Sequence, residues 1–238
     1  MSWATGGDLS GQTIRNVDLS NARIVNADLT GASIEGEVGG LRINGVEVWP
    51  LIAKELERLH PERKLLFTTT PQGMKQAYDI VFGQIDATIE RARRLTEEQR
   101  HRRVDDEWST TETIRHLIFA VDAWILRAVL GETAPYHPIG LPFTEMGPTP
   151  AVTCDPAADP TFEEAVEVWQ GRVRTIRDLV DGLGDDDLER PIETTGDGYP
   201  PAGHETQVIG PLWTILEEGW WHNRFMNRDL DAIEGAER

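Results

Sequence analysis

The sequence has 238 residues, of which 41 are acidic and 23 are Lys or Arg, so its formal net charge is −18 at pH 7. Such an acidic surface repels phosphate backbones and anionic lipid headgroups, so we expect neither nucleic acid nor a membrane as a partner. No apolar run approaches the roughly 18 residues of a transmembrane helix, the first residues do not resemble a signal peptide, and the single cysteine cannot form an internal disulfide. These features predict a cytoplasmic protein.

An aliphatic residue recurs at every fifth position near the N-terminus, and a mostly small residue stands two positions before each. The aliphatic positions are Leu9, Ile14, Leu19, Ile24, Leu29 and Ile34. Neither the helical period nor the strand period explains this spacing. The pattern resembles the pentapeptide-repeat family, whose chains form a right-handed β-solenoid with the aliphatic and small residues pointing inward. Because the segment is short for a solenoid, we expect it to pack on the rest of the chain or on a second copy.

A β-hairpin is predicted directly after the repeat. Alternating aliphatic residues flank Asn44 and Gly45, and this pair is a strong hairpin signal because a type I′ turn requires positive φ at both central residues. The repeat and the hairpin together make up a predicted first segment, residues 1–48. A short helix that ends before Pro61 and a linker occupy residues 49–69.

Four helical patterns of about twenty residues each fill the predicted third segment, residues 70–238. Three of them open with capping signals, which are Thr70 before Pro71, Ser109 with Glu112, and Thr161 with Glu164. The fourth begins near Gln207. These elements predict a mainly α fold, an up-down four-helix bundle preceded by the short β-solenoid and hairpin. The connections at 132–160 and 185–206 are long enough to be lids or crossovers.

The second and fourth predicted helices carry residues suited to metal binding. His116 stands at the entrance to a helical run that is apolar on almost every side. Glu218 and His222 are one turn apart on a face of the fourth helix that otherwise points inward. A buried carboxylate and imidazole each need a strong partner, and a divalent cation would satisfy both. The alternative is a solvated glutamate–histidine pair and a hydrogen-bonded core histidine.

Residues from about 70 to 230 resemble the DinB-like superfamily of metal-binding four-helix proteins. The similarity is carried by residues 108–131, by 137–142 in the loop that follows, and by 216–225 and 228–230 in the last helix. Members generally bind a metal through one histidine on the second helix and a His-x-x-x-His pair on the fourth. Carried over to this sequence, the resemblance implies His116, Glu218 and His222 as the metal ligands.

Glu218 departs from the commoner pattern, which has histidine at this position. The same His…Glu-x-x-x-His form occurs in mycothiol-dependent maleylpyruvate isomerase, a zinc enzyme of this superfamily, and two histidines with one carboxylate are a ligand set of catalytic zinc. Zinc is therefore the expected metal, with nickel or manganese as alternatives. No other cofactor is expected, and the sequence does not assign a catalytic residue.

The resemblance also implies thiol chemistry. In relatives that are enzymes, the metal binds the thiolate of a small thiol such as mycothiol or bacillithiol, and this thiolate is the nucleophile. We therefore expect a metal-dependent S-transferase or isomerase, whose partners are a low-molecular-weight thiol and a small electrophile, and a homodimer as in related proteins. The alternative is a non-catalytic metal- or ligand-binding protein whose repeat segment mediates oligomerisation or docking.

Other polar residues have two interpretations each. Arg224 and Arg228 would either bind a substrate carboxylate or form surface ion pairs. His137 and His204 lie in the long connections and would either cover the metal or be ordinary loop histidines. Cys154 is interpreted as incidental, so that the nucleophilic thiol would come from a cosubstrate.

Overall fold

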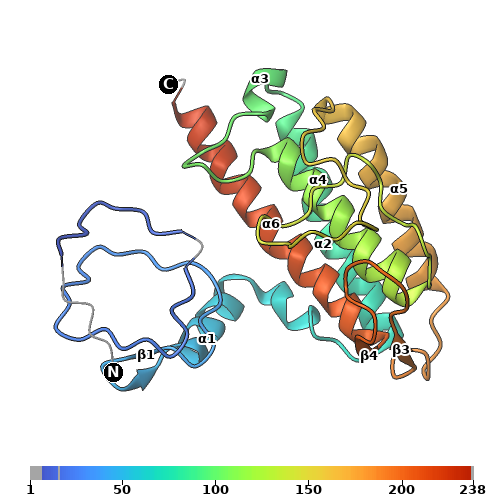
Figure 1. Cartoon of the computed structure of the whole chain (residues 1–238), viewed down its shortest axis with the longest axis horizontal. Coiled ribbons are helices and arrows are strands. Elements are labelled where there is room, and N and C mark those ends of the chain that lie inside the picture. Colours follow the sequence, from blue (N-terminus) through green and yellow to red (C-terminus); the bar gives the residue numbers. More distant parts are fainter. Residues whose placement is uncertain (1–6, 16, 237–238) are drawn as a thin grey trace. The chain divides into compact units, whose positions relative to one another are not determined.

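The computed structural model describes residues 7–15 and 17–236 of the chain, which divides into two compact units, Met1–Trp49 and Pro50–Arg238. The described residues are mainly helical, as predicted (Figure 1). None of the helices in these residues is both long and apolar enough to cross a membrane.

The repeat segment in the first unit turns at regular intervals. Backbone hydrogen bonds of 2.9–3.0 Å close the turns from Gln12 N to Leu9 O, from Ala22 N to Leu19 O and from Ala32 N to Leu29 O. The described residues between 7 and 40 form no strand, and the repeated aliphatic side chains are 49–65% exposed. The inward-facing solenoid core that the resemblance implies is therefore not formed here, because too few turns stack on one another to cover these side chains.

The hairpin of the first unit forms as predicted. Strands β1 (Arg42–Ile43) and β2 (Val46–Glu47) pair antiparallel. Asn44 and Gly45 join them with φ of 49° and 84°. These positive values are those that a type I′ turn requires.

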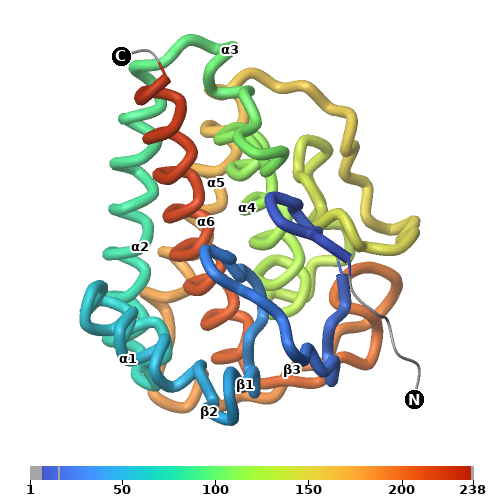
Figure 2. The backbone as a smooth tube through the Cα atoms, turned by 90° about the vertical axis from the view of Figure 1, so that its left-hand side faces the viewer, coloured from blue at the N-terminus to red at the C-terminus, as the bar shows by residue number. Residues whose placement is uncertain are grey.

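Four long helices build the second unit, and their arrangement is shown in Figures 1 and 2. They are α2 (Pro71–Ala92), α4 (Thr110–Val121), α5 (Phe162–Asp181) and α6 (Ile209–Gly235). A π-helical turn, η2 (Asp122–Val129), continues α4. The shorter elements are α1 (Trp49–Leu59), the 3-10 helix η1 (Pro61–Leu65), α3 (Glu97–Arg100), and the antiparallel strands β3 (Pro191–Glu193) and β4 (Glu205–Gln207).

The predicted capping signals open three of the long helices. Thr70 accepts a hydrogen bond from the backbone N–H of Gly73 at the start of α2. Ser109 with Glu112 and Thr161 with Glu164 form complete capping boxes at the starts of α4 and α5. These caps fix where α4 begins and therefore which of its turns carries His116.

The directions of α2, α5 and α6 follow from contacts near their ends. Arg93, just beyond the end of α2, forms an ion pair with Glu163 at the start of α5, so these two helices run antiparallel. The Tyr78 hydroxyl donates to the carbonyl of Leu212, and both residues lie in the N-terminal halves of their helices. Helices α2 and α6 therefore run parallel.

Helices α4 and α5 both begin beside α3 and so run parallel as well. The Thr111 hydroxyl donates to the carbonyl of Arg100, and the backbone N–H of Phe162 donates to Glu97. The connection at 131–160 thus returns the chain along the bundle as a crossover. The prediction of an alternating up-down bundle was wrong in this respect, because the connection is long enough to join parallel helices.

The core of the second unit lies between these four helices. Helix α2 packs against α5 and α6, and α4 packs against the same two helices. Phe82 and Trp169 meet edge to face with their ring centroids 5.6 Å apart, which joins α2 to α5. The α4–α6 interface carries the polar residues described next.

Candidate metal centre

His116 lies in the second turn of α4 and is 6% exposed. Its Nδ1 atom is 2.9 Å from the carbonyl oxygen of Leu141, which can only accept a hydrogen bond. The ring therefore carries a proton on Nδ1 and presents Nε2 to the bundle interior. A backbone carbonyl that holds the second nitrogen of a histidine in this way is a common feature of metal sites.

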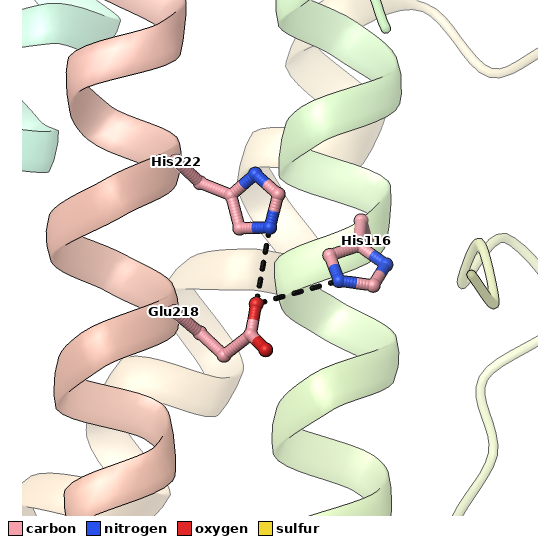
Figure 3. Close-up of side chains that lie close together, drawn as sticks. All are labelled: His116, Glu218 and His222. Atoms are coloured by element: carbon pink, nitrogen blue, oxygen red, sulfur yellow. Dashed lines mark ion pairs between the residues drawn. The ribbon is translucent and has the colours of Figure 1, made fainter. Parts of the chain in front are cut away.

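Glu218 and His222 lie one turn apart on α6 and face His116 across the helix interface (Figure 3). The Oε2 atom of Glu218 is 3.0 Å from Nε2 of His222 and 3.5 Å from Nε2 of His116. Ligand atoms from all three residues lie within 4.8 Å of one another, and the Glu218 side chain is 33% exposed. The sequence-predicted residues thus form a group that is open to solvent on one side.

The protonation states of Glu218 and His222 suit a metal. Burial opposes the ionisation of Glu218, but its interactions with His116 and His222 hold its pKa well below the usual range. Burial lowers the pKa of His222 and so favours its neutral form. An ionised carboxylate and neutral imidazoles are the forms that bind metal ions. Because their converging oxygen and nitrogen lone pairs repel one another, protons or a cation must lie between them, and a divalent cation fits this donor set.

Aromatic rings surround the candidate ligands. The ring of Trp108 is 4.5 Å from that of His116 and 6.1 Å from that of His222, measured between centroids. Phe119 lies 6.2 Å from His116, and Phe225 lies 5.8 Å from His222. Apolar rings at these distances reduce the local dielectric, which strengthens the interaction of the carboxylate with a cation.

The loop that supplies the Leu141 carbonyl is fastened to α4. Arg115 Nε donates to the carbonyl of Ile139 at 2.8 Å, and the Leu141 N–H donates to the carbonyl of Arg115 at 3.0 Å. Further along, the fully buried Asp122 accepts a hydrogen bond from the backbone N–H of His137 at 2.8 Å. These bonds hold the loop in the position that orients His116.

A buried ion pair supports the same loop. Arg172 on α5 donates through Nε to Asp122 at 2.5 Å. Burial raises the pKa of Asp122 to about 6, and the arginine and the His137 N–H oppose this rise. Asp122, which the sequence did not single out for this role, therefore joins α5 to the loop beside the candidate metal centre.

The other residues considered in the sequence lie outside the ligand group. Neither His137 nor His204 is among the described residues that form it. Arg224 donates to Nε2 of His60 at 2.5 Å, and Arg228 pairs with its neighbour Asp229. The contact of Arg228 supports its interpretation as an ion-paired residue, whereas Arg224 contacts a histidine nitrogen and forms no ion pair in this contact.

A family model for the DinB superfamily matches residues 83–223. The chain belongs to this superfamily. The matched range includes His116, Glu218 and His222, and metal binding is a general property of the superfamily. No curated protein and no solved structure shows a significant match to the chain.

Proposed function

We propose that this DinB-superfamily protein is a zinc-dependent enzyme that uses a low-molecular-weight thiol of the mycothiol type, acting as an S-transferase or an isomerase. The observation that carries the proposal is the convergence of His116, Glu218 and His222 within 4.8 Å. Two histidines and one carboxylate are the ligands of catalytic zinc sites that keep a fourth position for water or substrate. The partial exposure of Glu218 supports access from solvent.

The thiol of this reaction would be a cosubstrate. Cys154, the chain's single cysteine, is partly buried, and burial raises its pKa to about 12, so it carries its proton at neutral pH. A zinc ion held by the three ligands would lower the pKa of an external thiol and so supply a thiolate. The thiol proton would pass to solvent, and the sulfur would bond to the electrophilic carbon. In a transfer reaction, the leaving group of the electrophile would depart with the electron pair of the bond that joined it to that carbon.

The test combines metal analysis with turnover. We expect one zinc per chain in the wild type, its loss in His116→Ala and Glu218→Ala, and its retention in the neighbouring control Glu217→Ala. Zinc-loaded wild type should consume mycothiol in the presence of monobromobimane or chlorodinitrobenzene, and Cys154→Ser should do so equally well. Wild type that neither contains nor takes up zinc would overturn the proposal.

A second candidate is a non-catalytic metal-binding protein that assembles through its repeat segment. It is favoured by the exposure of the repeated aliphatic side chains, which are 49–65% accessible in the single chain. If this second function is correct, the purified protein should contain zinc but should not consume any thiol. This candidate also predicts a homodimer, seen by light scattering, that dissociates when Leu19 and Leu29 are both replaced by Ser.

A further inference from the structure

Tyr199 lies in the connection between β3 and β4, and its ring packs against the metal-facing side of α4. Its ring centroid is 6.1 Å from that of Phe119 and 5.2 Å from that of Phe143. Phe119 in turn lies 6.2 Å from His116 and is only 2% exposed. The buried ring of Phe119 is therefore a neighbour of both Tyr199 and the candidate metal ligand His116.

The backbone of Tyr199 is held on both sides by one hydroxyl group. The Tyr136 hydroxyl accepts a hydrogen bond from the Tyr199 N–H and donates one to the Tyr199 carbonyl, each at 2.8 Å. Arg127, which is 5% exposed, donates to the carbonyls of Gly196 and Pro200 at 2.7 and 3.3 Å. The loop is thus fixed before any ligand arrives.

Gly198 shows how closely this loop is seated. A Cβ atom added there would lie 2.7 Å from the Tyr136 hydroxyl and 2.9 Å from the Arg127 guanidinium, and the residue has a φ of +143°. Neither a side chain nor the usual backbone conformation of an L-residue fits at this point. The position of Tyr199 therefore depends on close contact between this loop, Arg127 of η2 and the Tyr136 hydroxyl.

The Tyr199 hydroxyl keeps its hydrogen-bonding capacity. No hydrogen bond from it to any described residue is present, whereas the Tyr136 and Tyr78 hydroxyls are both bonded to backbone carbonyls. Burial raises the pKa of Tyr199, and the charge of Glu218 raises it further, so the phenol keeps its proton at neutral pH. A rigidly held, protonated donor with no partner among the described residues therefore lies one ring, that of Phe119, away from His116.

The neighbouring arginine side chains already have hydrogen-bond partners, so they are less suited to donate a hydrogen bond to a ligand at the metal centre. Arg115 donates to the carbonyls of Ile139 and Asp155, and Arg172 donates to Asp122. Their guanidinium groups are thereby committed to the loop and the bundle. An anionic ligand beside Glu218 would need a donor that is not already bonded, and Tyr199 meets this requirement.

We propose that the Tyr199 hydroxyl donates a hydrogen bond to the thiolate sulfur held at the open position of the metal centre. This inference rests on the proposed function, because it requires a metal-bound thiolate. Tyr199 would then be a binding residue for the cosubstrate, and Tyr136, whose hydroxyl bonds to the backbone of Tyr199, would be a positioning residue.

The test measures thiol binding to the cobalt(II)-loaded full chain, with 2-mercaptoethanol as the probe. The near-ultraviolet charge-transfer band between thiolate and cobalt reports occupancy without requiring turnover. Tyr199→Phe keeps the packed ring and removes the hydroxyl, and we expect its dissociation constant for the thiol to rise about tenfold with unchanged cobalt stoichiometry. Tyr136→Phe should show a smaller rise.

Tyr78→Phe is the matched control, because it removes the third tyrosine hydroxyl of the chain from a core contact with Leu212. It should bind the thiol with wild-type affinity. Wild-type affinity in Tyr199→Phe, with the band present in both proteins, would overturn the role of Tyr199 and leave the proposed function intact. Absence of the band from cobalt-loaded wild type would instead overturn both.

Discussion

The carbonyl oxygen of Leu141 accepts a hydrogen bond from Nδ1 of His116 at 2.9 Å. This contact decides which ring nitrogen of His116 is free to bind a cation, and it turns that nitrogen toward Glu218 on α6. A loop, rather than the helix that carries the histidine, therefore sets the geometry of the candidate metal centre. Mutations can therefore separate the ligands from the structure that supports them.

Replacement of His222 should abolish stoichiometric metal binding. His222→Ala removes a nitrogen that lies 3.0 Å from the Glu218 carboxylate, and the two remaining donors would leave the cation underbound. Elemental analysis of the dialysed protein measures the result, with His101→Ala as a control because His101 pairs with Glu97 on α3. Full metal content in His222→Ala would show that this residue is not a ligand.

Replacement of Arg115 should weaken metal binding without abolishing it. Its guanidinium donates to the carbonyls of Ile139 and Asp155 and so holds the loop that orients His116. Arg115→Lys keeps the charge but cannot make both bonds, and we expect affinity for zinc to fall roughly tenfold, as for other residues that orient metal ligands. A competition titration with a chromophoric chelator measures this, and an unchanged affinity would mean that the loop does not orient the ligand.

The sequence predicted those parts of the structure that depend on local signals. The capping boxes at Ser109 and Thr161 and the Asn44–Gly45 turn are local, because each involves residues within a few positions of one another. The spacing of Glu218 and His222 also predicted that they share one face of α6. Helix direction was not predictable in this way, since it depends on where the long 131–160 connection packs.

The contacts that support the candidate site could also not be predicted from the sequence. The Leu141 carbonyl belongs to the backbone, so no residue type marks it as the partner of His116. Asp122 lies in an otherwise apolar run, and this was the one signal in the sequence that it needs a buried partner, which the structure identifies as Arg172. Tyr199 carries no such signal, because its relation to Glu218 arises only when the β3–β4 connection packs against α4.

Asp122 should make stability depend on pH between about 4 and 6. Its pKa of about 6 in the folded state exceeds that of an unfolded aspartate, so the folded protein binds this proton more tightly. Stability attributable to Asp122 is therefore greatest at low pH and falls as the pH rises through this range, by up to about 3 kcal/mol. Urea denaturation from pH 4 to 7 should show that the wild type loses stability relative to Asp122→Asn over this interval.

Asp181→Asn serves as the control for that series. Asp181 is an exposed carboxylate at the end of α5, where it pairs with Lys75 on α2, outside the Asp122 cluster. A pH dependence that persists unchanged in Asp122→Asn would show that another group titrates in this range.

Two glycines on adjacent helices should respond in opposite ways to alanine. A Cβ at Gly219 would lie 2.8 Å from Val81 Cγ1, a contact that real Cβ atoms do not make, so Gly219→Ala must displace the Val81 side chain or push α6 away from α2. We expect a loss of about 1–3 kcal/mol in unfolding free energy from this overpacking. Because Glu218 is the preceding residue, we also expect the affinity for zinc to fall.

Gly83 in α2 is the matched counterpart. No atom lies within 4 Å of a Cβ built there, so Gly83→Ala should gain about 0.5–1 kcal/mol from the higher helix propensity of alanine. Its affinity for zinc should stay at the wild-type value. Urea denaturation and zinc titration of both variants test this, and equal stability effects at the two positions would contradict the close packing of α6 on α2 beside Glu218.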